Sequence, residues 1–209
     1  MSNDLILVFD KDGVLFDSEL VKVEAFDKVF AGYPQQAENI HQYIIDTIGI
    51  PRSVRFEYIC QHFLKIAEIE STAARFVQES VEMLDKKLLE IPPMKGLVSF
   101  LEQYPLIPKY VCSMAPQNEV ERQLAHHGLD QYFIKLYGFP TPKKTVIQRL
   151  KEKERKRIVF LGDTLHDYEV AQETGVDFIG VQTSHFNHPF IDLDIPIISG
   201  FDQIGANFI

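Results

Sequence analysis

The chain has 209 residues, of which 45% are hydrophobic and 24% are charged, a length and composition typical of a globular protein with a full core. Its formal net charge of -9 argues against a nucleic-acid-binding protein, because phosphate backbones are held mainly by clustered Lys and Arg. The first apolar run, residues 5–9, is far shorter than a signal-peptide core or a membrane span, so we expect no membrane partner and a cytoplasmic location.

Four short apolar runs predict buried strands. Residues 5–9 form an unbroken run with β-branched members, which is typical of a strand buried on both faces of a parallel sheet. Similar runs occur at residues 110–112, 158–161 and 178–181, each next to a helical pattern. This alternation predicts a doubly wound, parallel-sheet α/β core of the Rossmann-like kind.

The segment between the first two strands carries no clear strand signal and reads as entirely helical. Three serines stand where they can cap amphipathic helices, and a fourth short helix is expected over residues 38–47. The capping serines are Ser18, Ser53 and Ser71. Because the apolar stripes of these helices can pack together, we expect an inserted α-helical domain over residues 18–92. The catalytic core then comprises residues 1–17 and 93–209.

The core resumes with an expected helix over residues 97–104. Pro116 suits the first turn of a further helix that runs to His127 and stops at Gly128, the usual placement of Pro at a helix start and Gly at its end. Another amphipathic helix is expected over residues 145–153. These helices would cover the predicted sheet.

Two carboxylates follow the first strand directly, at Asp10 and Asp12. Residues two apart in an extended chain point the same way, and open α/β sheets bind ligands at the carboxyl ends of their strands. Like charges so close together favour a divalent metal between them. Taken alone, an Asp-x-Asp-Gly sequence could equally be a polar turn or a calcium loop.

A second pair of carboxylates, Asp163 and Asp167, follows another apolar strand. If a helix starts near Asp163, positions four apart share a face, so both carboxylates could point at the same metal. Four carboxylates placed after two buried strands are hard to explain by solubility. They therefore strengthen the interpretation of Asp10 and Asp12 as metal-site residues.

Three further residues could contact a phosphate group. Ser113 follows the strand at 110–112, so its hydroxyl and the next backbone N–H groups could hold an anionic oxygen, although an ordinary helix cap would use the same residue. Lys143 and Lys144 stand just before a predicted helix. An ammonium there could offset the charge of the carboxylates and the phosphate, but a single lysine is more often a solvated surface residue.

The order of these motifs resembles that of the haloacid dehalogenase superfamily. The resemblance is carried by Asp10-Lys11-Asp12-Gly13-Val14-Leu15-Phe16-Asp17-Ser18, then Ser113, then Lys143, then Gly162-Asp163-Thr164-x-x-Asp167 with Ala171 and Gly175 behind it. The first and last motifs are specific, and the middle two gain weight from their order. The helical insert is similar to the inserted cap of phosphoglycolate-phosphatase-like and β-phosphoglucomutase-like members.

The resemblance implies an Mg²⁺-dependent phosphohydrolase that acts on a small phosphorylated metabolite. Asp10 would be the nucleophile that forms an aspartyl-phosphate. Asp12 would protonate the leaving oxygen and then activate the attacking water. Lys143 would steady the charge between Asp10 and the phosphate. Because phosphoryl transfer needs mostly positioning and charge neutralisation, this small set suffices.

The resemblance also implies the groups that hold Mg²⁺. They are the side chain of Asp10, the backbone carbonyl of Asp12, the side chain of Asp163, and Asp167 as a ligand or as a partner of the ligands. Because carboxylates supply hard oxygen ligands, we expect the histidines near the motifs to lie at the surface or to support the ligands. These are His126, His127, His166, His185 and His188.

Three features depart from the commonest family pattern. Lys11 stands where many relatives carry an apolar residue. Met114 and Ala115 offer no second hydroxyl after Ser113, which leaves phosphate binding there to the backbone amides, including that of Met114. The sequence also has two adjacent lysines where the family commonly has a Lys-Pro pair. Either Lys143 or Lys144 could therefore enter the site, and we favour Lys143.

Other functions stay open at this point. Arg52, in Gly49-Ile50-Pro51-Arg52, resembles a cap-loop arginine that meets the far phosphate of the substrate in β-phosphoglucomutase-like members, or it is an exposed arginine near a helix start. A phosphosugar mutase is therefore one alternative. Others are a non-enzymatic phospho-accepting domain and an inactive family member that binds a ligand. We expect a monomer or a small homo-oligomer.

Overall fold

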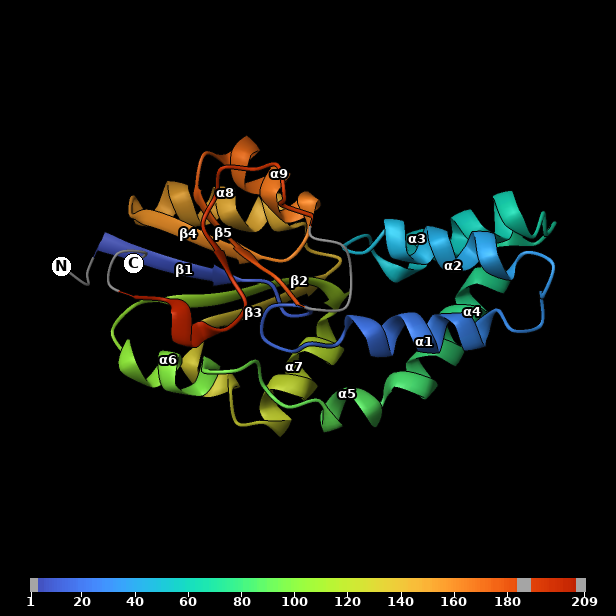
Figure 1. The fold of residues 1–209 in the computed structure, drawn as a ribbon, viewed down its shortest axis with the longest axis horizontal. Helices are drawn as coiled ribbons and strands as arrows, with labels where there is room; N and C mark the ends of the chain where they lie inside the picture. Colours follow the sequence, from blue (N-terminus) through green and yellow to red (C-terminus); the bar gives the residue numbers. More distant parts are fainter. Residues whose placement is uncertain (1–3, 184–188, 206–209) are drawn as a thin grey trace. The chain divides into compact units, whose positions relative to one another are not determined.

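The computed structural model describes residues 4–183 and 189–205. The chain forms two compact units, one made of residues 1–17 and 92–209 and the other of residues 18–91 (Figure 1). Pro92 therefore belongs to the first unit, one residue earlier than the expected boundary. Residues 18–91, all of which the structure describes, contain helices and no strand.

The first unit is built on one parallel sheet of six strands. They are β1 (Leu5–Phe9), β2 (Lys109–Pro116), β3 (Lys135–Phe139), β4 (Arg157–Gly162), β5 (Asp177–Val181) and β6 (Ile197–Ile198), in the spatial order β3-β2-β1-β4-β5-β6. Parallel pairing of β1 sets Phe9 opposite both Val111 and Leu161. The expected α/β fold is confirmed, and the first strand of the chain lies between its neighbours in the interior of the sheet.

Helices cover both faces of this sheet. They are α6 (Leu97–Gln103), α7 (Gln117–His126), α8 (Lys143–Glu154) and α9 (Leu165–Thr174), with short 3₁₀ helices at Asp130–Tyr132 and Phe201–Gln203. Figure 1 shows α8 and α9 on one face and α6 and α7 on the other. Alternate residues of β1 serve the two faces, because successive strand side chains point in opposite directions. Ile6 and Val8 pack with the α8 and α9 side, and the ring of Phe9 lies 6.3 Å from that of Phe100 on α6.

The second unit is a small set of packed helices. They are α1 (Glu19–Val29), α2 (Ala37–Asp46), α3 (Arg52–Tyr58), a π-helical turn (Ile59–Phe63), α4 (Ile69–Leu84) and α5 (Lys87–Glu90). Its core is aromatic: the ring of Phe56 lies 5.0 Å edge-on to both Phe26 and Phe30, and Phe30 lies 5.0 Å from Phe76. Edge-to-face pairs of this kind add to the free energy gained by burying the rings.

Several helix starts differ from those expected. The helices expected to begin at Ser53 and Ser71 start earlier, at Arg52 and Ile69. Pro51 stands directly before the first of them, with a φ of -53° and a non-helical ψ of 136°. Ser71 lies inside the first turn, where its hydroxyl donates to the carbonyl of Glu68. Ser18 does stand before α1, but its side chain makes no capping hydrogen bond.

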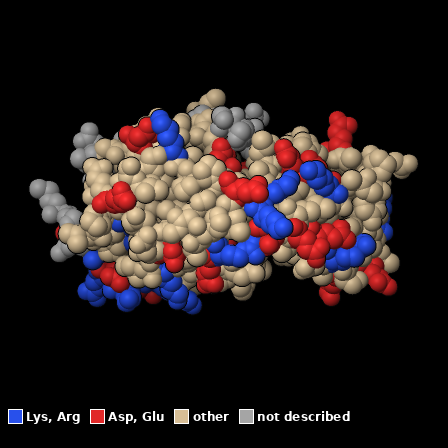
Figure 2. Space-filling model, turned by 90° about the horizontal axis from the view of Figure 1, so that it is seen from below, with Lys and Arg blue, Asp and Glu red and all other residues tan. Residues whose placement is uncertain are grey.

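The distribution of surface charge and the lengths of the helices bear on two classes of partner, nucleic acids and membranes. On the face drawn in Figure 2, acidic and basic side chains lie interspersed, a pattern of a solvated surface rather than of a groove for a phosphate backbone. Among the described residues, no helix is long and apolar enough to cross a membrane.

Candidate active site

Asp10 stands at the carboxyl end of the central strand β1. Its backbone N–H donates to the carbonyl of Leu161 at 2.9 Å, which continues the pairing with β4 by one residue. Its carboxylate is buried and accepts hydrogen bonds at both oxygens, from the backbone N–H of Lys11 at 2.6 Å and from Nζ of Lys143 at 2.7 Å. The strand and these two donors fix the position of the carboxylate.

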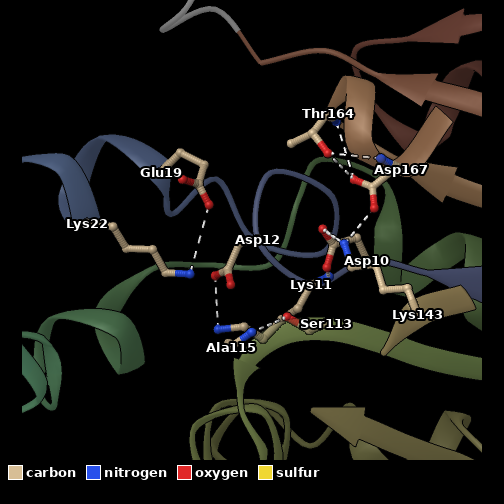
Figure 3. Close-up of polar contacts among 10 residues, drawn as sticks. All are labelled: Asp10, Lys11, Asp12, Glu19, Lys22, Ser113, Ala115, Lys143, Thr164 and Asp167. Atoms are coloured by element: carbon tan, nitrogen blue, oxygen red, sulfur yellow. Dashed lines mark hydrogen bonds and ion pairs between the residues drawn. The ribbon is translucent and has the colours of Figure 1, made fainter. Parts of the chain in front are cut away.

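Lys143 is the first residue of α8, and its side chain is almost inaccessible to solvent. Its ammonium lies 2.7 Å from Oδ2 of Asp10 and 2.6 Å from Oδ1 of Asp167 (Figure 3). Lys144 is half exposed instead and pairs with Glu173 at 3.0 Å. Of the two lysines that the sequence left open, Lys143 is therefore the one that contacts Asp10. The helix begins two residues earlier than expected, directly after Pro142.

Asp163 and Asp167 approach Asp10 by a route that the sequence did not predict. Helix α9 begins at Leu165, so Asp163 lies outside it and the expected four-residue helical spacing does not apply. Thr164 caps the helix: its hydroxyl accepts from the backbone N–H of Asp167 at 3.2 Å and donates to Oδ2 of Asp167 at 2.7 Å. Carboxylate oxygens of the three aspartates nevertheless lie within 4.8 Å of one another.

The charges in this cluster do not balance. Burial raises the pKa of Asp10 to about 7, and the carboxylates of Asp167 and Asp12 act in the same direction, whereas Lys143 opposes the rise. Burial alone would lower the pKa of Lys143, yet Asp10 and Asp167 raise it above its ordinary value. One ammonium thus faces three carboxylates, counting Asp163. The surplus negative charge and the oxygen ligands fit a divalent cation such as Mg²⁺.

Gly13 lets the chain turn closely past this cluster. Its φ of +72° lies in the left-handed region, and a Cβ added there would come within 2.0 Å of Oδ2 of Asp163. The turn is closed by backbone hydrogen bonds from Leu15 and Phe16 to the carbonyl of Lys11. Glycine is therefore required here both for the backbone conformation and for the close approach of Asp163.

Asp12 and Lys11 form a second buried group in the same turn. The ammonium of Lys11 lies 2.9 Å from Oδ1 of Asp12, 3.2 Å from Oε1 of Glu119 and 2.8 Å from Oε1 of Gln123. The motif pattern assigns no role to Lys11. A signal was available, because a lysine directly after a buried strand and between two carboxylates is itself expected to be buried and to need acceptors.

Ser113 lies within β2, two residues beyond Val111, the partner of Phe9, and so at the same edge of the sheet as Asp10. It is buried, and its hydroxyl accepts from the backbone N–H of Ala115 at 3.1 Å (Figure 3). Because β2 continues to Pro116, Ser113 does not cap a helix, and that alternative is wrong. Met114 is half buried in the same strand.

The remaining candidates are Arg52 and the histidines. Arg52 belongs to the helical unit, where its guanidinium is buried 5.3 Å from the centre of the Phe26 ring. His166 is exposed on α9. The ring of His127 packs 5.2 Å from that of Phe16. His185 and His188 lie outside the described residues.

Comparisons with known proteins identify a relative by sequence and several structures of similar fold. A phosphorylated carbohydrates phosphatase from Thermotoga maritima is 25% identical over 183 residues, which cover 83% of this chain and 82% of that protein. A crystal structure of β-phosphoglucomutase from Clostridium difficile superposes with a TM-score of 0.76 at 16% identity, covering 100% of this chain and 95% of the other. The crystal structure of a predicted phosphoglycolate phosphatase from Haemophilus somnus superposes with a TM-score of 0.72 at 17% identity, covering 94% of this chain and 95% of the other.

The family itself follows from the sequence match. Residues 7–181 match the family described as haloacid dehalogenase-like hydrolase, and this range extends from the first strand to the end of β5. It includes both aspartate motifs, Ser113, Lys143 and the whole helical unit. The family resemblance and the expectation of a hydrolytic enzyme are thereby confirmed. The chain belongs to the haloacid dehalogenase-like hydrolases.

Proposed function

We propose that the protein is an Mg²⁺-dependent phosphatase that hydrolyses a small-molecule phosphate monoester through an aspartyl-phosphate at Asp10. One observation carries the proposal: the buried Asp10 carboxylate ends the central strand with an ammonium 2.7 Å away and with two further carboxylates within 4.8 Å. A nucleophile, a fixed cation and ligands for a divalent metal thus meet at one point. The name of the Thermotoga maritima relative, a phosphatase of phosphorylated carbohydrates, supports the same reaction class.

The chain's own residues account for both chemical steps. A carboxylate oxygen of Asp10 attacks phosphorus, the bond to the leaving oxygen breaks, and that oxygen takes its electron pair and a proton from Asp12. Asp12, now ionised, accepts a proton from water as the water attacks phosphorus and releases Asp10. Lys143 stabilises the carboxylate and the phosphoryl group throughout. Ser113 and the backbone amide of Met114 hold phosphoryl oxygens.

The metal would be held by the side chains of Asp10 and Asp163 and by the backbone carbonyl of Asp12. Asp167 accepts from Lys143 at Oδ1 and from Thr164 at Oδ2. We therefore propose that Asp167 orients Lys143 and contributes to the metal site through this contact as much as by direct ligation. When bound, Mg²⁺ supplies positive charge to the phosphoryl oxygens. The imbalance of three carboxylates against one ammonium supports this assignment.

The helical unit is proposed as a cap that selects the substrate, with Arg52 as a contact to a second anionic group. The role of Arg52 is supported by the fold that the whole chain shares with a β-phosphoglucomutase. Packing over the Phe26 ring fixes the position of the guanidinium. We expect Arg52→Ala to raise the KM for a sugar bisphosphate while leaving the KM for a small aryl phosphate unchanged. Equal changes for both substrates would count against the role of Arg52.

The reaction is tested by phosphate release from p-nitrophenyl phosphate, with Mg²⁺, with a chelator, and in Asp10→Asn. We expect turnover that needs Mg²⁺ and falls by at least about 10³-fold in the variant, as it does when covalent nucleophiles are removed. Asp177→Asn is the matched control, because Asp177 is an exposed aspartate of β5 that pairs with Arg157 of β4. Unchanged turnover in Asp10→Asn would refute the proposal.

A phosphosugar mutase is separated from a phosphatase by the fate of the phosphate. A mutase retains phosphate on the sugar and needs a catalytic bisphosphate, whereas a phosphatase releases it to water. Phosphorus NMR of a sugar monophosphate incubated with enzyme, Mg²⁺ and the bisphosphate distinguishes the two. We expect inorganic phosphate to accumulate.

A further inference from the structure

Lys11 is fully buried, and the structure gives its ammonium three oxygen partners. These are Oδ1 of Asp12 at 2.9 Å, Oε1 of Glu119 at 3.2 Å and Oε1 of Gln123 at 2.8 Å. A lysine ammonium carries three N–H donors, and three acceptor oxygens therefore match its capacity. A buried ammonium without such partners would be costly, which explains why they gather around this one.

Two of the three partners come from one helix. Glu119 and Gln123 are four residues apart on α7, and positions four apart share a helix face. The helix therefore presents a carboxylate and an amide oxygen together, and these hold the end of the Lys11 side chain. The third partner, Asp12, belongs to the same turn as Asp10. Lys11 thus ties the Asp12 carboxyl group to α7. Figure 3 shows its contact with Asp12.

We propose that Lys11, anchored by Glu119 and Gln123, is a positioning residue that orients the Asp12 carboxyl group for proton transfer to the leaving oxygen. The proposal rests on the phosphatase function above. An ammonium donates hydrogen bonds and cannot accept one. Oδ1 of Asp12, which faces the ammonium of Lys11, therefore acts as an acceptor there and does not carry the proton. The proton that moves to the leaving oxygen is therefore carried on Oδ2. This contact selects which oxygen faces the substrate.

The role predicts a dependence on the leaving group. The alkoxide that leaves from an alkyl phosphate such as β-glycerophosphate needs a proton, whereas p-nitrophenolate leaves without one. Lys11→Met should therefore lower kcat for β-glycerophosphate by at least about tenfold more than kcat for p-nitrophenyl phosphate, a part of the usual contribution of a general acid. A merely structural role would lower both values by the same factor.

Lys109→Met is the matched control. Lys109 is also a buried lysine, but it lies in β2 and donates to the backbone carbonyls of Tyr104 and Ile107. Its loss should leave the ratio of the two kcat values unchanged. Glu119→Gln, which weakens the anchor but keeps its shape, should shift the ratio in the same direction as Lys11→Met and by less. It also keeps the proposal testable if Lys11→Met does not fold.

The decisive comparison is made in Asp12→Asn. Asp12→Asn also lacks the base for the second step, so the two substrates are compared here by the single-turnover rate of leaving-group release. With the proton donor removed, adding Lys11→Met should change the ratio of these rates no further, because residues that act through one another are not additive. An equal loss for both substrates in Lys11→Met, or an additional shift of the ratio in the double variant, would overturn the positioning role. Wild-type protein that turned over neither substrate with Mg²⁺ would instead contradict the phosphatase function on which the role depends.

Discussion

Two buried lysines contact the same aspartate motif, but their partners differ. Lys143 bridges Asp10 and Asp167, which both belong to the cluster that fits a metal. Lys11 contacts Asp12 and is otherwise held by side chains of α7. The first lysine thus contacts the proposed nucleophile and the proposed metal site, and the second contacts the proposed proton donor. Removing each should therefore affect different parts of the reaction.

The largest effect on stability is expected at Lys143. Lys143→Met removes the ammonium between two buried carboxylates, and breaking a buried ion pair typically costs about 3–5 kcal/mol of the free energy of unfolding. Urea denaturation without metal measures this loss. Lys144→Met is the control, because its exposed pair with Glu173 is worth about 0–1 kcal/mol. Equal losses of stability in the two variants would mean that the buried contacts of Lys143 with Asp10 and Asp167 contribute no more than an exposed ion pair.

The same pair of variants sharpens the comparison with Lys11. In Lys143→Met the carboxylate cluster becomes more negative, so stabilisation of the folded state by Mg²⁺ should exceed that of the wild type. In Lys11→Met the cluster is intact, so the stabilisation should stay at the wild-type value. Thermal unfolding across a series of Mg²⁺ concentrations tests both expectations. A similar response of the two variants would remove the distinction between the lysines.

A smaller effect on stability is expected at Gly13, in the turn that follows Asp10 and Asp12. A left-handed backbone costs a non-glycine residue about 1–2 kcal/mol, and in Gly13→Ala the added methyl group also collides with Asp163. Gly128→Ala is matched for backbone, with a φ of +65°, but its nearest neighbour is 3.9 Å from the added Cβ. Gly13→Ala should therefore lose more stability and also lose the stabilisation by Mg²⁺. Equal behaviour of the two variants would contradict the close approach of Asp163.

The smallest effect is expected at Thr164. Thr164→Val removes the hydroxyl that caps α9 and donates to Asp167, which should cost about 1 kcal/mol of the free energy of unfolding. Thr164→Ser keeps the hydroxyl and should retain most of that stability. Urea denaturation of both variants is the measurement. A loss in Thr164→Ser as large as that in Thr164→Val would assign the effect to packing rather than to the hydrogen bonds.

The interior of the sheet was predictable from the sequence, whereas its edges were not. Strand β1 is apolar along its whole length because it is covered on both faces. Strand β3 is an outer strand with partly exposed side chains, and β6 has only two residues, so neither gives a strong apolar signal. Burial pattern is the main sequence signal for a strand, and it fades where burial is partial.

The site was predictable in its residue types but less so in its geometry. The aspartates and Lys143 were identified by order and spacing, yet the approach of Asp163 depends on the cap formed by Thr164, which begins the helix later than expected. The burial of Lys11 is predictable from its place in the motif, but its partners on α7 are not, because they are more than 100 residues away in the chain. Contacts between distant segments leave no local pattern, and so only the folded chain reveals them.

The central claim is that Asp10 carries the phosphoryl group during turnover. It is tested most directly in Asp12→Asn with p-nitrophenyl phosphate and Mg²⁺, since this substrate needs no proton donor and the variant lacks the proposed base that activates water. Acid quenching followed by peptide mass spectrometry should find a phosphoryl group on Asp10, formed with a burst of nitrophenolate. A burst without modification of Asp10, or modification of another residue, would contradict the mechanism.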